Sequence, residues 1–132
     1  MRTQLSFAAA DRLHRSAEFL RLQRNGERFQ GRHFVVYAGN LEGRLDDEPA
    51  RSRLGVTVSR RIGDAVVRNR VKRRVREIFR KAIRAELPAG TSIVVIALAG
   101  SAALESPAIS DELSIAARNL SGRIAAKGAG RS

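Results

Sequence analysis

Arginine and lysine side chains, which can bind phosphate groups, are concentrated in one segment of the chain, residues 60–84. Eleven basic and two acidic residues give this segment a net charge of +9, out of +12 for all 132 residues. Arginine suits bidentate phosphate contacts and stacking. A generally arginine-rich composition would spread this charge along the chain. The concentration of positive charge in this one segment of a small domain therefore indicates a polyanionic partner that binds the segment.

The same segment has the periodicity of an amphipathic helix. Gly63–Asp64 marks its start, with Asp64 as N-cap, and apolar residues recur at helical spacing until the chain reaches Leu87–Pro88. Arg68 falls within the apolar stripe, which it can do without burial only if the first turn overhangs the edge of the sheet. The basic residues expected to project from the opposite face are Arg70, Arg73, Arg74, Arg80, Lys81 and Arg84.

Such a helix can lie on nucleic acid, lie on an anionic membrane, or be an ordinary solvated surface helix. The membrane is disfavoured because the apolar face is needed to cover a sheet and contains no Trp. The solvated helix is disfavoured because like charges stand four residues apart, which costs about 0.2–0.5 kcal/mol per pair. Asn69 is the one side chain suited to reading base edges. The pattern therefore favours structured RNA, bound through its backbone and shape, over DNA.

Residues that could themselves cut a phosphodiester bond are sparse. A metal-dependent nuclease needs convergent carboxylates, and the one acidic cluster, Asp46–Glu48, lies in a polar loop beside Pro49. His14 and His33 are isolated, and Ser59 has no evident base partner. The absence of cysteine excludes a thiolate zinc site and a cysteine nucleophile. We therefore expect no catalytic residue, metal or cofactor on the protein itself.

The remaining segments predict an α+β fold, with helices packed on one small sheet. Helices are expected from Ser16 to about Arg24 and after Ser106–Pro107. Strands are predicted over His33–Leu41, Leu54–Ser59 and Thr91–Leu98, the last covered on both faces. The polar stretch Glu42–Ser52 predicts the loop of a long hairpin. A further strand, the third before the long helix, is expected either in that hairpin region or near Phe29–Arg32.

Side-chain alternation predicts which strand residues share a face. In the first strand, Phe34 and Val36 point one way, and Val35 and Tyr37 point the other way. In the second strand, the residues expected to face inward are Leu54, Val56 and Val58. Those expected to face outward are Gly55, Thr57 and Ser59.

The length corresponds to a single domain. We expect an N-terminal extension over residues 1–11, an RNA-binding domain over 12–124 and a disordered tail over 125–132. The longest apolar run, Ile93–Ala99, is too short to cross a bilayer, and no export signal is visible. A cytoplasmic location is therefore expected.

These motifs, in this order, resemble the bacterial ribonuclease P protein subunit. The most specific part is the run SRRIGDAVVRNRVKR at residues 59–73, directly after the strand LGVTVS. Arg12-Leu13, Glu18-Phe19 and the run Arg32–Tyr37 also follow the family's order. The resemblance covers roughly residues 12–124.

The resemblance implies an α-β-β-β-α-β-α order with a left-handed crossover around the long helix. It also implies a protein cofactor that pairs with a catalytic RNA, in a ribonucleoprotein that endonucleolytically removes the 5′ leader of precursor tRNA. The protein would strengthen and broaden substrate binding, and the RNA with its Mg²⁺ ions would perform hydrolysis.

Two sets of site residues follow from the same resemblance. The residues that would dock on the RNA subunit are Arg60, Arg68, Asn69, Arg70, Lys72, Arg73 and Arg76. Those matching a cleft for the single-stranded leader are Phe19, Val35, Tyr37, Arg61 and Arg68. Gln23 stands where many members carry a second aromatic residue, so a weaker or more polar leader contact is expected.

Two functions of other classes are the alternatives. A structural or ribosome-associated RNA-binding protein would bind RNA without affecting leader removal. A stand-alone nuclease would cut RNA with no catalytic RNA present.

Overall fold

The structure, a computed structural model, describes residues 16–40, 53–88 and 90–130. Within these residues, three α-helices and four strands follow the order α1, β1, β2, β3, α2, β4, α3, as the resemblance implies. The helices are α1 (Ser16–Asn25), α2 (Ala65–Ile78) and α3 (Ser106–Gly130). The strands are β1 (Glu27–Gln30), β2 (Phe34–Asn40), β3 (Arg53–Val58) and β4 (Thr91–Ala97).

The strands form one sheet in the order β1-β2-β4-β3. β2 runs antiparallel to both β1 and β4, whereas β3 runs parallel to β4. The predicted hairpin between β2 and β3 is therefore wrong, because β4 lies between them. A strand as apolar as β4 is buried best when it has neighbours on both edges and helices over both faces. The predicted loop Glu42–Ser52, with its acidic cluster Asp46–Glu48, lies outside the described residues.

The further strand expected before the long helix is β1, which overlaps the second of the two expected positions, near Phe29–Arg32. It follows α1 directly and pairs with β2, and the Gly31 N–H donates a hydrogen bond to the Phe34 carbonyl at 2.8 Å to close the turn. Only the short turn over residues 31–33 separates the two strands, so this neighbouring pair does form a hairpin.

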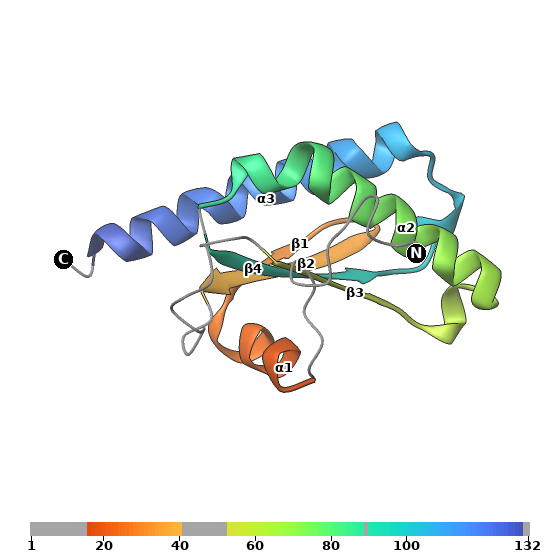
Figure 1. Cartoon of the computed structure of the whole chain (residues 1–132), viewed down its shortest axis with the longest axis horizontal. Coiled ribbons are helices and arrows are strands. Elements are labelled where there is room, and N and C mark those ends of the chain that lie inside the picture. The colour runs from red at the N-terminus through yellow and green to blue at the C-terminus, as the bar shows by residue number, and fades with distance from the viewer. Residues whose placement is uncertain (1–15, 41–52, 89, 131–132) are drawn as a thin grey trace, which may run out of the picture.

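The sheet is covered on both faces (Figure 1). α2 and α3 lie over one face and enclose the larger core, whereas α1 lies on the opposite face. Phe34 and Val36 belong to the larger core, and Tyr37 packs with Leu22 of α1 on the other side. The predicted alternation along β2 is therefore confirmed.

α2 begins where the sequence predicts. The Asp64 carboxylate caps the helix by accepting a hydrogen bond from the Val67 N–H at 3.0 Å. The helical path continues through a π-type turn, Phe79–Ile83, and a 3₁₀ turn, Arg84–Glu86. The backbone becomes extended at Leu87, which confirms the predicted end. β3, α2 and β4 form the parallel crossover whose left-handedness stays a prediction of the resemblance.

α3 continues to Gly130, so most of the tail expected to be disordered, residues 125–132, is helical, and residues 131–132 lie outside the description. Ala125, Ala126 and Lys127 are good helix formers, which favours this extension. No helix in the described ranges is long and apolar enough to cross a membrane.

Candidate nucleic-acid interface

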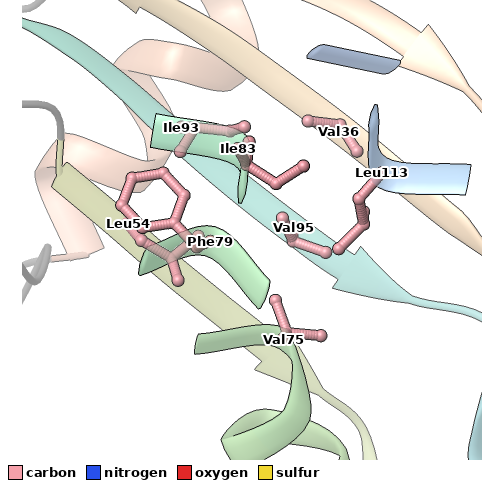
Figure 2. Close-up of a pocket in the computed structure, with 8 residues that line it drawn as sticks. All are labelled: Val36, Leu54, Val75, Phe79, Ile83, Ile93, Val95 and Leu113. Carbon is pink, nitrogen blue, oxygen red and sulfur yellow. The ribbon is translucent and has the colours of Figure 1, made fainter. Parts of the chain in front are cut away.

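A pocket inside the larger core offers no polar group to a ligand. Figure 2 shows its lining side chains, which come from the α2 region, the strands and α3 and contain only carbon. They are Val36, Leu54, Val75, Phe79, Ile83, Ile93, Val95 and Leu113. Such a pocket cannot orient a polar ligand, so this pocket belongs to the packing of the core.

The outer side of α2 carries a basic strip, which we define as Asn69, Lys72, Arg73 and Arg76. Asn69 and Arg73 are exposed, and Lys72 and Arg76 are half-buried. At about 100° per residue these positions share the side opposite the buried Val71. Arg60 is exposed on the 3₁₀ turn that leads into the helix. The strip therefore places three basic side chains and one amide on the same side of α2.

Arg68 is held at the start of α2. Its Nε donates a hydrogen bond to the Gly63 carbonyl at 3.2 Å, and the residue is half-buried rather than fully inside the core. The guanidinium therefore stays at the junction between β3 and α2 and escapes full burial, as expected from its position in the first turn.

Three arginines expected to project into solvent are half-buried instead. Arg74 Nη1 donates a hydrogen bond to the Leu104 carbonyl at 2.9 Å, and the Arg84 guanidinium lies 5.3 Å from the centre of the Phe79 ring. Arg70 lies one turn before Arg74, and its Nε is buried without a hydrogen-bond partner in the described part of the chain. α2 packs against α3 and the turn before α3 as well as against the sheet, and the 3₁₀ turn that carries Arg84 also packs against α3.

On the face of the sheet that α1 covers, four directly paired residues form a row, which we call the central row. It consists, from β1 to β3, of Arg28, Tyr37, Val94 and Gly55. Directly paired residues point to the same side of a sheet. Tyr37 and Val94 pack with Leu22 of α1, so the whole row faces α1. The row is buried at Val94 and exposed at Arg28, its β1 end.

Phe19 of α1 covers the β3 end of the central row. A Cβ atom added at Gly55 would overlap the Phe19 ring, so the ring rests directly on the Gly55 backbone. Gly55, expected to face outward, is therefore buried, whereas Phe19 itself is half-buried. The Phe19 ring contributes to packing and still presents part of its surface.

A second row lies beside the central row, and we call it the open row. It consists, from β1 to β3, of Gln30, Val35, Ile96 and Thr57. Gln30 and Thr57 are exposed, Ile96 is half-buried and Val35 is 7% exposed. This face therefore has an apolar floor with polar ends.

The structure brings Phe19, Val35 and Tyr37 of the predicted cleft to this one face. Arg61 is exposed on the turn that follows β3, and Arg68 lies in the first turn of α2. Within the described residues, neither arginine forms a hydrogen bond or a cation–π contact with Phe19 or Tyr37.

Comparison with known proteins decides the family. A family model described as Ribonuclease P matches residues 7–121. The chain belongs to the ribonuclease P protein family. It is therefore a component of an endoribonuclease complex that processes tRNA, and its partner there is the ribonuclease P RNA.

Similar ribonuclease P protein components come from several bacteria. That of Desulfatibacillum aliphaticivorans is 39% identical over 108 residues, covering 82% of this chain and 86% of its own. That of Thermotoga petrophila is 43% identical over 91 residues, covering 69% and 72%.

Solved structures of ribonuclease P proteins share the fold. The protein from Thermotoga maritima matches with a TM-score of 0.69 and 30% identity, over 82% of this chain and 96% of its own. A Staphylococcus aureus mutant, described as defective in mRNA degradation activity, matches with a TM-score of 0.66 and 34% identity, over 79% and 82%. These matches also confirm the predicted α+β class.

Sequence reasoning missed two residues on the α1 face of this ribonuclease P protein, Arg28 and Ile96. Arg28 lies in β1, whose position the sequence left open, and Ile96 lies in a strand expected to be covered on both faces. The alternation of β1 is a signal that could have found Arg28, since its neighbours Glu27 and Phe29 are half-buried and Arg28 is exposed. The described residues contain no group of three or more His, Cys, Asp or Glu side chains that could hold a metal ion.

Proposed function

We propose that this ribonuclease P protein binds two RNAs at once, on surfaces that lie on opposite faces of its sheet. The basic strip of α2, with Arg60 and Arg68, docks on the catalytic RNA. The α1 face holds the single-stranded 5′ leader of precursor tRNA. The observation that carries the proposal is that the charged helix and the Phe19–Tyr37 face lie on opposite sides of the sheet (Figure 1).

The chemistry of the basic strip suits a folded RNA. Arg73 and its neighbours offer charge and N–H donors to phosphate oxygens, whereas Asn69 alone offers a side-chain amide for base edges. Contacts of this kind position an RNA by its backbone and shape. Docking by phosphate contacts also makes affinity fall as salt rises.

The α1 face suits a single strand. Tyr37 and the exposed part of Phe19 offer stacking surfaces, which hold bases at about 1–3 kcal/mol each without choosing their sequence. Val35 and Ile96 supply an apolar floor, and the arginines at its margins attract the phosphates. The leader would therefore be held by a surface that accepts many sequences.

Phosphodiester hydrolysis belongs, in this proposal, to the RNA subunit and its Mg²⁺ ions. The protein holds no cofactor of its own and contributes binding. The mRNA degradation mentioned for the Staphylococcus aureus protein makes a reaction with protein alone a necessary arm of any cleavage assay.

The two surfaces can be tested separately by substitution. Arg73→Ala is expected to weaken binding of the protein to ribonuclease P RNA and to reduce the slope of log affinity against log salt by about one unit. Arg118→Ala is the matched control, because Arg118 is exposed on α3 and pairs with Glu86 at 3.3 Å. A wild-type salt slope for Arg73→Ala would contradict the assignment of the basic strip.

In the assembled holoenzyme, Tyr37→Ala is expected to weaken binding of leader-bearing precursor tRNA about tenfold, through loss of one stacked base. Binding of mature tRNA should not change. Equal losses for both ligands would show that Tyr37 serves packing alone. A protein that binds RNA tightly yet never discriminates between these ligands would be a structural RNA-binding protein, the alternative function.

A further inference from the structure

Arg28, on the outer strand of the sheet, is organised as a binding group rather than as a free surface charge. It lies opposite Tyr37 in the strand register, and both side chains point to the α1 face. Its Nε donates a hydrogen bond to the Tyr37 hydroxyl at 3.2 Å, and its Cζ lies 5.8 Å from the centre of the Tyr37 ring. One Nη donates to the Gln30 side-chain oxygen.

These contacts fix the guanidinium and leave much of it available. Two of its N–H groups are used, so three of the five have no partner among the described residues. No ion pair joins Arg28 to a carboxylate within these residues. The neighbouring Glu27 pairs instead with Arg123 of α3 at 3.7 Å. The charge of Arg28 is therefore oriented and not neutralised.

The backbone under Arg28 is held as well. Arg123 Nη1 donates a hydrogen bond to the Arg28 carbonyl at 2.8 Å, and its Nη2 donates to the Asn119 side-chain oxygen at 2.6 Å. α3 thus braces the outer strand β1 from the opposite side. A binding group on a braced strand loses little conformational entropy when it takes a ligand.

We propose that Arg28, Tyr37 and Gln30 form a nucleotide subsite at the β1 end of the α1 face, which we call the leader face because it is proposed to hold the 5′ leader. The free N–H groups of Arg28 bind a phosphate of the leader, and the adjoining base stacks on the joint surface of the guanidinium and the Tyr37 ring. The inference rests on the proposed leader binding and adds to it a residue, a position and a chemistry.

The subsite also adds stacking surface to a face with few aromatic rings. Among the described aromatic residues, Phe29, Phe34 and Phe79 pack in or against the larger core, which leaves Phe19 and Tyr37 on the leader face. Arginine planes stack on bases as aromatic rings do. Arg28 therefore supplies, from the neighbouring strand β1, a stacking surface in addition to those of Phe19 and Tyr37.

The test is a binding measurement with reconstituted holoenzyme, using precursor tRNA with an unstructured leader and mature tRNA as the two ligands. Arg28→Ala is expected to weaken leader-bearing substrate about tenfold, leave mature tRNA unchanged and lower the salt slope by about one unit. Arg28→Lys should restore the salt slope but only part of the affinity, because lysine keeps the charge and lacks the planar fork. Arg118→Ala serves as control and should match wild type.

The outcomes separate this inference from the proposed function. If Tyr37→Ala loses affinity for leader-bearing substrate and Arg28→Ala does not, the subsite is refuted and leader binding on this face stands. If the wild-type holoenzyme binds both ligands equally, the proposed function fails first. A loss in Arg28→Ala that extends equally to mature tRNA, or that accompanies a lowered melting temperature, overturns the subsite in favour of a structural role.

Discussion

Phe19, on the α1 face, combines an observed packing role with the binding role proposed for it. Its ring rests on the Gly55 backbone, because glycine alone leaves room for it there, and it packs beside Leu22 and Val94. Phe19→Ala would therefore remove core packing together with any stacking surface. Tyr37 and Arg28 lie further from this contact, so their substitution reports more directly on binding.

Adding one methyl group at Gly55 should test the packing without touching Phe19. Gly55→Ala is expected to displace the Phe19 ring and to lower the free energy of unfolding by about 1–3 kcal/mol. Gly122→Ala is the matched control, since a Cβ there meets nothing within 4 Å. In the helix α3 that change should raise stability by about 0.5–1 kcal/mol. Urea unfolding of both variants measures the difference, and equal effects would contradict the Phe19–Gly55 contact.

At the scale of elements, α3 holds the β1–β2 turn through a single carboxylate. Glu112 Oε2 accepts hydrogen bonds from the backbone N–H groups of His33 at 2.8 Å and Phe34 at 3.0 Å. Its Oε1 lies 2.9 Å from His33 Nδ1. The turn is thereby fixed, and with it the start of β2, which carries Val35 and Tyr37.

Glu112→Ala should leave those two N–H groups without their acceptor and lower the free energy of unfolding by about 2–3 kcal/mol. Asp111→Ala is the control, because Asp111 is the exposed neighbour on the same helix and should change stability by less than about 0.5 kcal/mol. Chemical denaturation distinguishes them. Wild-type stability of Glu112→Ala would show that the turn needs no support from α3.

Which elements the sequence could predict follows from the range of the interactions that determine them. The start of α2 depends on Asp64 and Val67, three residues apart, so a capping pattern was enough to place it. The position of β4 between β2 and β3 depends on pairing between distant segments, such as Val56 with Val95. Local patterns favoured a hairpin instead, since neighbouring strands pair in most folds.

Local sequence patterns predict the candidate site only in part, for the same reason. Periodicity predicted the basic helix but not that Arg74 would donate a hydrogen bond to the Leu104 carbonyl instead of projecting into solvent. Alternation placed Val35 and Tyr37 on one face, whereas the row that joins Tyr37 to Arg28 and Gly55 required the register of all four strands.

For the whole molecule, the sheet acts as a partition between two surfaces of different chemistry. α2 and α3 bury one face and present charge outward, whereas α1 lies on the other face, beside the buried Val35 and the half-buried Ile96 (Figure 1). A small protein arranged in this way can touch a structured RNA and a single strand together. Its effect on catalysis would then come from binding and positioning the substrate.

The most direct test of this account is cleavage of a 5′-leader precursor tRNA at low magnesium concentration. Bacterial ribonuclease P RNA alone, this protein alone and both together are compared, with an mRNA fragment as a second substrate for the protein alone. Efficient cleavage at the mature 5′ end is expected only when the RNA and the protein are both present. Tight RNA binding with no stimulation, or cleavage by the protein alone, would contradict it.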